Sequence, residues 1–250
     1  MTPLVSVITP VFNSEKFVSE TIQSVQRQTF SDWEMILVDD FSTDNSIEEI
    51  ENFACEDERI KLIKLSQNSG PAVARNHAIK GASGRYIAFL DSDDLWLPEK
   101  LEVQINWMQT KNLVLTFSQY KIIDIEGHET GKIIDVPEKV NYAKLLNFNV
   151  IGCLTAVYDS KILGKVFMPE ILKRQDYGLW LKVLKRGFQA HGIKQPLALY
   201  RTGKDSVSSN KLKAATYNWK ILYKHEKLSF PKAIFHFTNY IFTGLKKYYF

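Results

Sequence analysis

The sequence predicts a mixed α/β protein with a mostly parallel, doubly wound sheet and helices on both of its faces. Two observations support this fold class. Over the first hundred residues, short apolar runs rich in β-branched residues alternate with stretches whose apolar side chains recur at helical spacing. Acidic residues directly follow two of these runs, and ligands bind beyond the carboxyl ends of strands in parallel sheets.

Four strand–helix pairs are expected in this first part. The strands are predicted over 5–11, 33–40, 60–65 and 85–90, and the helices over 14–28, 42–54, 70–82 and 97–109. Ser14 is the expected N-cap of the first helix. Pro71 and Pro98 fall in the first turns of the third and fourth helices, and Gly81 falls near the end of the third.

The pattern changes after residue 113. We expect a β-hairpin over 113–136 that turns at Glu126-Gly127, a strand over 153–159 and an amphipathic helix over 176–187. A short last strand over 197–201 leads into a polar loop over 202–210. Because no linker rich in proline or glycine separates the two parts, residues 1–210 are expected to form one domain.

Composition is that of a globular protein: 45% hydrophobic and 24% charged residues suit one large core.

Cys55 and Cys153 lack metal-ligand spacing, which favours free thiols in a reducing compartment such as the cytoplasm. The apolar start, "MTPLVSVITPVF", has no basic region or cleavage site, so a strand is expected there rather than a signal peptide.

Residues 211–250 differ from the rest of the chain. They hold eight lysines, one acidic residue (Glu226) and eleven aromatic residues, so this tail carries +7 within an overall net charge of +4. Pro231 is expected to separate two helices. The composition favours an element that lies on an anionic membrane surface. Packing on the main domain and a homodimer contact are alternatives, and nucleic acid is disfavoured because no recognition motif appears.

"FLDSDDLWLP" places three carboxylates, Asp91, Asp93 and Asp94, directly after the fourth strand. Like charges at this distance repel, which costs stability unless something positive lies nearby. An Asp-X-Asp at a strand end suits a divalent cation that bridges phosphates. The alternative is a solvated loop or a helix cap, and the position beside a second acidic strand end favours the cation.

That second strand end holds Asp39 and Asp40, either of which can accept hydrogen bonds from a nucleotide base or ribose. Turn formation and capping in "DDFSTDNS" are the alternative, and we favour ligand binding for Asp40. Asp176 begins a helix, where it acts either as an N-cap or as a general base. Arg201 and Lys204 lie in a loop that either closes over a diphosphate or is a solvated connector.

Four blocks, in order, resemble a family 2 glycosyltransferase of the GT-A fold over residues 4–210. They are "VSVITPVFNSEKFVSETIQSVQRQTFSDWEMILVDDFSTDNS", "GPAVARNHAIKGASGRYIAFLDSDDLWLPEKL", "RQDYGLWLKVLKRG" and "YRTGKDSVSSN". More narrowly, the chain with its tail is similar to bacterial glycosyltransferases of teichuronic acid and capsule assembly. The resemblance thus implies a GT-A domain over 1–210 and a helical tail over 211–250.

The resemblance also implies roles for single residues. Pro10 and Phe12 would line the nucleotide-base pocket, and Asp40 would bond the base. Asp91 would face the ribose or sugar of the donor, and Asp93 would bind Mg²⁺ or Mn²⁺.

By the same resemblance, Asp176 would be the catalytic base. Arg75, in the "ARN" block, would reach the donor, with a helix-packing salt bridge as the alternative. Some relatives have a histidine metal ligand in the last loop, and "RTGKDSVSSN" has none.

These features predict a metal-dependent, inverting glycosyltransferase. It would move a sugar from a nucleotide diphosphate, a UDP-sugar by preference, to an undecaprenyl-diphosphate-linked saccharide at the inner face of the cell membrane. A nucleotidyltransferase is the first alternative, although "TPVFNSEKF" lacks the Gly-rich basic loop expected there. A non-catalytic nucleotide-sugar-binding subunit is the second, and the intact Asp176 argues against it.

Overall fold

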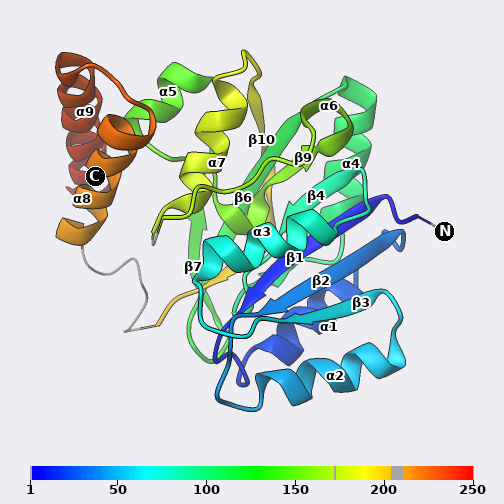
Figure 1. The fold of residues 1–250 in the computed structure, drawn as a ribbon. Helices are drawn as coiled ribbons and strands as arrows, with labels where there is room; N and C mark the ends of the chain where they lie inside the picture. Colours follow the sequence, from blue (N-terminus) through cyan, green and yellow to red (C-terminus); the bar gives the residue numbers. More distant parts are fainter. Residues whose placement is uncertain (1, 172, 204–210, 250) are drawn as a thin grey trace.

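A computed structural model describes residues 2–171, 173–203 and 211–249 of the protein (Figure 1). Within these residues, ten strands join in one sheet, and eight of them lie in the order β3-β2-β1-β4-β9-β6-β10-β5. The strands are β1 (Val5–Val11), β2 (Trp33–Asp39), β3 (Ile60–Lys64), β4 (Tyr86–Phe89), β5 (Leu95–Trp96), β6 (Leu115–Ile123), β7 (Glu129–Ile134), β8 (Lys139–Val140), β9 (Val157–Asp159) and β10 (Ala190–Arg201).

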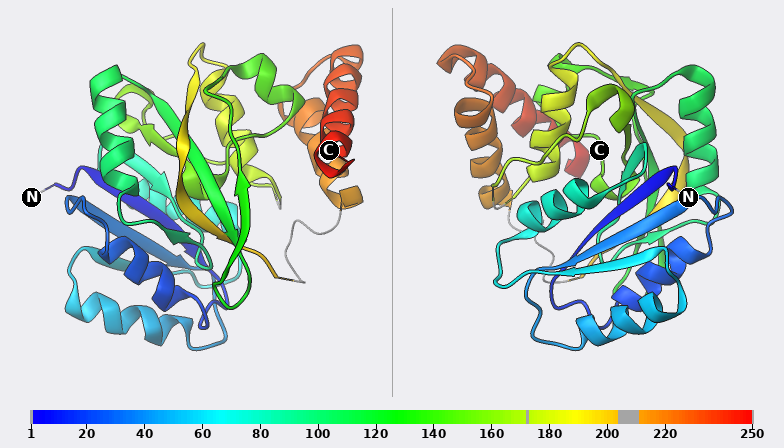
Figure 2. Two further views of the ribbon diagram at one scale, coloured as in Figure 1. Left: turned by 180° about the vertical axis from the view of Figure 1, so that it is seen from behind. Right: turned by 45° about the vertical axis from the view of Figure 1, so that its right-hand side comes forward.

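The helices cover both faces of this sheet (Figures 1 and 2). They are α1 (Val18–Gln26), α2 (Ser46–Glu56), α3 (Pro71–Gly81), α4 (Lys100–Lys111), α5 (Tyr142–Asn147), α6 (Ser160–Leu163), α7 (Gln175–Leu184), α8 (Lys211–Lys220) and α9 (Phe230–Tyr249), with a 3₁₀ turn η1 (Cys153–Thr155) and a π-helical turn η2 (Ile221–His225).

Strand direction brings the acidic strand ends to one edge. β3, β2, β1 and β4 are mutually parallel, β9 runs antiparallel between β4 and β6, and β10 is parallel to β6. Val11 at the end of β1 is in register with Asp39 of β2, and Ile8 is in register with Phe89 of β4. The residues that follow β2 and β4 therefore emerge at the same edge of the sheet.

Two hydrophobic clusters, one on each face, explain the continuous apolar runs of the central strands. In β2, Ile36 and Val38 pack into the cluster that contains α3 and α7, whereas Met35 and Leu37 pack into the one that contains α1, α2 and α4. Because side chains alternate between the faces of a strand, a strand buried on both faces must be apolar throughout.

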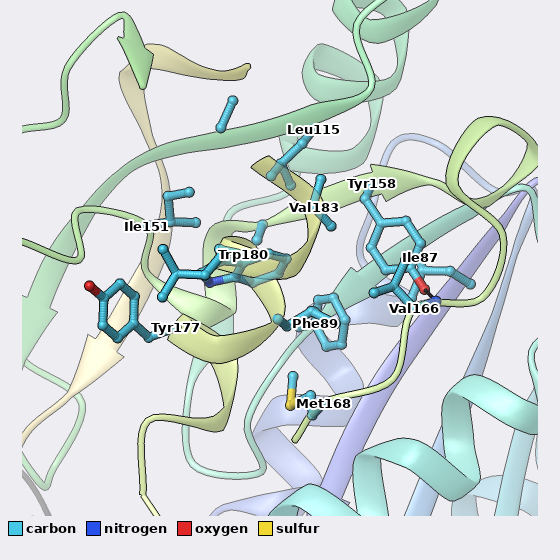
Figure 3. Close-up of a cluster of buried hydrophobic side chains, with 14 of the residues drawn as sticks. Ile87, Phe89, Leu115, Ile151, Tyr158, Val166, Met168, Tyr177, Trp180 and Val183 are labelled. Carbon is cyan, nitrogen blue, oxygen red and sulfur yellow. Dashed lines mark hydrogen bonds between the residues drawn. The ribbon is translucent and has the colours of Figure 1, made fainter. Parts of the chain in front are cut away.

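The core also fixes α7 against β4. Phe89 of β4 and Trp180 of α7 are fully buried and meet edge to face, with ring centroids 5.6 Å apart (Figure 3). Phe89 lies two residues before Asp91, and Trp180 lies four residues after Asp176. This aromatic contact therefore sets the separation of the acidic loop from the first turn of α7.

The predicted strands and longer helices are confirmed, with differences at particular sites. Ser14 does not cap α1: the N-cap is Phe17, and the Ser14 hydroxyl instead bonds the Ser92 hydroxyl at 2.7 Å. β10 begins at Ala190 rather than residue 197, because its polar first half pairs with β6 and β8. The short elements β5, β8, α5 and α6 were not predicted.

The C-terminal helices pack beside α5 and α7 (Figure 2). Ile221, Leu222 and Ala233 are buried in the same hydrophobic cluster as α7. Pro231 lies in the first turn of α9, which confirms that it separates two helices. No helix of the described ranges combines the length and apolarity needed to cross a bilayer.

Gly84 permits a close backbone approach that stabilises the start of β4. A Cβ there would lie 2.6 Å from the Ser6 nitrogen and 2.7 Å from the Val5 carbonyl carbon. We expect Gly84→Ala to lower the free energy of unfolding by about 1–3 kcal/mol, because backbone cannot move aside as a side chain can. Urea denaturation would measure it. Gly81→Ala is the matched control, since its Cβ would meet only side chains at 3.8 Å or more; equal losses would contradict this explanation.

Candidate functional site

The candidate nucleotide pocket lies at the ends of β1 and β2. Pro10 is buried in β1, Phe12 just beyond it is 49% exposed, and Asp40 follows β2. The Asp40 carboxylate is buried and accepts hydrogen bonds from the backbone nitrogens of Ser69 (2.7 Å) and Gly70 (2.8 Å). The structure brings the three predicted residues together, with Asp40 also anchoring the loop before α3, and its contact with a base stays a prediction.

The acidic loop after β4 contains three carboxylates in different surroundings. Asp91 is partly exposed and forms an ion pair with Arg75 of α3. Asp93 is exposed and has no ion-pair partner among the described residues. Asp94 is fully buried: its Oδ1 accepts a hydrogen bond from the Arg201 nitrogen at 2.8 Å, and its Oδ2 has no partner in the described part of the chain.

Crowding changes the protonation of this loop. The surrounding protein partly desolvates the Asp93 carboxylate even though water reaches it, and the Asp91 charge repels it, so that its pKa rises to about 6. Burial and the charges of Asp93 and Asp91 raise the pKa of Asp94 well above its ordinary value. Both shifts follow first from burial and then from neighbouring carboxylate charges, so deprotonating all three carboxyl groups together is unfavourable unless a cation lies nearby.

A divalent cation near these carboxyl groups would favour their deprotonated form. Across the described ranges, no three His, Cys, Asp or Glu side chains form a ready metal-binding cluster. Mg²⁺ usually takes only one or two carboxylates and completes its coordination with water and substrate phosphates. The exposed Asp93 carboxylate supplies a hard oxygen ligand of this kind at the edge where β4 ends.

Arg75 connects the acidic loop with Asp176. Burial alone would lower its pKa, but the Asp91 charge raises it, with a further contribution from Asp176. Asp176 lies in the first turn of α7, where burial raises its pKa and the Tyr177 backbone and the Arg75 charge oppose that rise. The structure thus brings together three predicted residues, Arg75, Asp91 and Asp176, although the sequence positions are up to 101 apart.

Asn149 orients the Asp176 carboxylate. Its Nδ2 donates to Asp176 Oδ2 at 3.4 Å, and its Oδ1 accepts from the Ile151 nitrogen at 3.1 Å. Because a backbone donor fixes the amide oxygen, the amide nitrogen must face Asp176. Asn149 lies in a segment without a recognisable motif, so no sequence signal identified it.

Arg201 is buried, and all three of its guanidinium nitrogens donate hydrogen bonds. Its guanidinium donates to the Asp93 carbonyl oxygen (2.8 Å), the Ile125 carbonyl oxygen (3.0 Å) and the Glu20 carboxylate (2.6 Å). In this arrangement it ties the acidic loop to α1 and to the β6–β7 hairpin. Its predicted contact with a diphosphate stays a prediction, and Lys204 lies outside the described residues.

A family model decides the class of the protein. Residues 6–164 match the model described as Glycosyl transferase family 2. The chain belongs to glycosyltransferase family 2. The matched region includes Pro10, Phe12, Asp40, Arg75 and the acidic loop, whereas Asp176 lies beyond it.

Two relatives of this glycosyltransferase extend the likeness to nearly the whole chain. The Bacillus subtilis protein TuaG, named for teichuronic acid biosynthesis, is 43% identical over 98% of this chain and 97% of its own. The Escherichia coli protein WfgD, named as a UDP-Glc:alpha-D-GlcNAc-diphosphoundecaprenol beta-1,3-glucosyltransferase, is 41% identical over 99% of this chain and 96% of its own.

Solved structures confirm the GT-A fold of this glycosyltransferase. S. aureus TarS 1–349, in complex with UDP-GlcNAc, superposes with a TM-score of 0.71 at 20% identity, covering 95% of this chain and 71% of TarS. The mannosyltransferase PcManGT from Pyrobaculum calidifontis, in complex with GDP-Man and Mn²⁺, superposes with a TM-score of 0.70 at 17% identity. The match covers 92% of this chain and 66% of PcManGT.

The raised pKa of Asp93 makes stability depend on pH. Because its folded pKa of about 6 exceeds the ordinary 3.8, the folded state binds this proton more tightly, and stability falls as pH rises from about 4 to 6. Asp93→Asn removes that loss, so we expect a higher Tm than wild type at pH 8 and no difference at pH 4. Water screens the exposed group, which keeps the gain at about 1 kcal/mol or less.

Thermal unfolding across this pH range would measure the effect of Asp93→Asn. Asp32→Asn, at an exposed carboxylate outside the acidic loop, is the control and should change the Tm little at any pH. A difference between Asp93→Asn and wild type that is equal at pH 4 and pH 8 would contradict the raised pKa.

Proposed function

We propose that this glycosyltransferase transfers a sugar, with inversion, from a UDP-sugar to an undecaprenyl-diphosphate-linked saccharide during synthesis of a bacterial surface polysaccharide. The observation that carries the proposal is the juxtaposition of Asp91 and Asp176 around Arg75 at one edge of the sheet. WfgD, at 41% identity over nearly the full length, is named for such a donor and acceptor, which supports the same chemistry here.

The donor would lie against the ends of β1, β2 and β4. Pro10, Phe12 and Asp40 would hold the nucleotide, and Asp91 would face the ribose or the sugar. Asp93 would hold Mg²⁺ or Mn²⁺, which offsets the charge that develops on the diphosphate leaving group. The repulsion between the neighbouring carboxylates of the acidic loop supports this assignment, as does the Mn²⁺ named in the PcManGT complex.

Asp176 would accept the proton of the attacking acceptor hydroxyl. An inverting transfer is a single displacement, so it needs a base on the side opposite to the leaving group. Burial raises the pKa of Asp176 toward the range in which a carboxylate is an effective base near neutral pH. The Asn149 amide holds one carboxylate oxygen, and the other would face the acceptor.

The cationic residues would have separate roles. Arg75, held by Asp91, would contact the donor and keep the two carboxylates from repelling each other. Arg201 would position the acidic loop through its three guanidinium contacts, and Lys204 would approach the diphosphate. Membership of family 2 favours this reaction over nucleotidyl transfer.

We place the reaction at the inner face of the cell membrane, where the protein would associate peripherally. A lipid-linked acceptor cannot leave the bilayer readily, so the enzyme must reach it at the surface. The basic and aromatic tail over 211–250 is the segment whose composition suits this contact.

Asp176→Asn tests the assignment of the base. The amide has the size of the carboxylate but cannot accept the proton, so we expect sugar transfer to fall by at least about 100-fold. Transfer from UDP-glucose to GlcNAc-diphosphoundecaprenol, followed by radiolabel, would measure it, with UDP binding as the control that should not change. A variant that transfers at the wild-type rate would show that Asp176 is not the base, and a wild type that binds UDP-sugar without transfer would support the non-catalytic alternative.

A further inference from the structure

Helix α9 exposes an apolar face to solvent. Its exposed large side chains are Phe230 (58%), Ile234 (41%), Phe235 (60%), Ile241 (38%) and Phe242 (71%). At 3.6 residues per turn these positions, with Pro231 and Thr238, fall within an arc of roughly 140°. Among the residues of α9 up to Thr243, Thr238 is the one polar side chain of this arc, so the outward face of this part of α9 is apolar where a helix on a protein surface is usually polar.

The opposite arc of α9 faces the protein. Ala233 is buried, and Phe237 packs against the main hydrophobic cluster. Asn239 Nδ2 donates to the Asn147 side chain at 3.0 Å, and the Tyr240 hydroxyl accepts from Arg174 at 2.9 Å. The inner face of α9 therefore makes the contacts with the rest of the protein, and the outer apolar face does not take part in them.

The exposed charges of the described tail side chains have one sign. Four lysines of the described tail are exposed: Lys220, Lys224, Lys227 and Lys232. Glu226, the sole acidic residue of the tail, has a side chain only 7% exposed and bonds Lys185 and the Tyr142 hydroxyl. Every charge that the described tail side chains present to solvent is thus positive.

We propose that α9 lies flat on an anionic membrane, with Phe235 and Phe242, the most exposed side chains of its apolar face, inserted and the lysines against lipid phosphates. An apolar helix face in a segment whose exposed charges are all positive favours the headgroup boundary of anionic bilayers. A second copy of the chain fits less well, because a two-fold contact would place the same set of lysines near each other. The inference rests on the proposed function, since it identifies the surface that meets a lipid-linked acceptor.

This docking face has a fixed relation to the candidate site. Asn147, which bonds α9, lies two residues before Asn149, and Arg174, which also bonds α9, lies two residues before Asp176. The inner face of α9 is therefore joined to both segments that carry the predicted base and its orienting amide. A helix held on the bilayer would hold Asp176 at a constant height above the acceptor's diphosphate.

Vesicle binding by the full-length protein tests the inference. We expect wild type to cosediment with vesicles of phosphatidylglycerol and phosphatidylcholine and to bind pure phosphatidylcholine at least tenfold more weakly. Phe235→Ser/Phe242→Ser should lose at least tenfold in affinity for the anionic vesicles, because it removes the two most exposed apolar side chains of α9. Lys224→Gln/Lys227→Gln should weaken binding at low salt and have less effect at high salt.

Ile133→Ser/Ile162→Ser is the matched control. Both side chains are exposed to a similar degree, 51% and 48%, but lie on β7 and α6, so vesicle binding should stay at the wild-type level. If Phe235→Ser/Phe242→Ser bound anionic vesicles as tightly as wild type, the docking face would be wrong. If it instead converted a dimer to a monomer in sedimentation equilibrium with vesicle binding unchanged, the occupant would be a second copy.

The catalytic proposal is measured separately with a water-soluble, short-chain acceptor. Phe235→Ser/Phe242→Ser should transfer to it at the wild-type rate and lose transfer only to the membrane-embedded acceptor. A wild type that binds vesicles but transfers to neither acceptor would overturn the proposed function and leave the docking face in place.

Discussion

Mutual repulsion among the three carboxylates that end β4 is the constraint around which the rest of the site is arranged. Arg75 from α3 pairs with Asp91, and the Arg201 backbone bonds Asp94 while its guanidinium holds the Asp93 carbonyl. Both arginines are buried, where charge interactions are stronger than in water. The arginines do not cancel the whole cost of these carboxylates, since burial and the Asp91 charge still raise the pKa of Asp93 to about 6, and a bound cation would offset what remains.

The fold delivers these compensating charges from distant parts of the chain. Parallel pairing of β1 with β2 and β4 places two acidic loops at one edge, and the contact of Phe89 with Trp180 holds the start of α7 beside them. Glu20 from α1 reaches Arg201 from the end of β10, across 181 positions. Apolar packing therefore supplies the free energy that keeps like charges close together.

The elements that could be predicted are those whose burial shows in the local sequence. The central strands are buried on both faces, so their residues are apolar in unbroken runs that the sequence displays directly. The first half of β10 was not predicted because "AHGIKQP" contains polar residues and a proline, which are uncommon in strands. Its pairing with β6 and β8 stabilises the strand in spite of these residues. The carboxylates were predicted from their strand-end positions, whereas Asn149 and the partners of Arg201 depend on contacts with no local signature.

The most direct test of a cation held at the acidic loop is calorimetric titration of UDP into the wild-type protein and Asp93→Asn, with and without Mn²⁺. GDP, CDP and dTDP serve as comparison nucleotides. We expect Mn²⁺ to tighten UDP binding to wild type at least tenfold, about 1.4 kcal/mol, and to leave binding to Asp93→Asn unchanged. Equal UDP affinity with and without Mn²⁺ in both proteins would contradict the claim that these carboxylates hold a cation against a diphosphate.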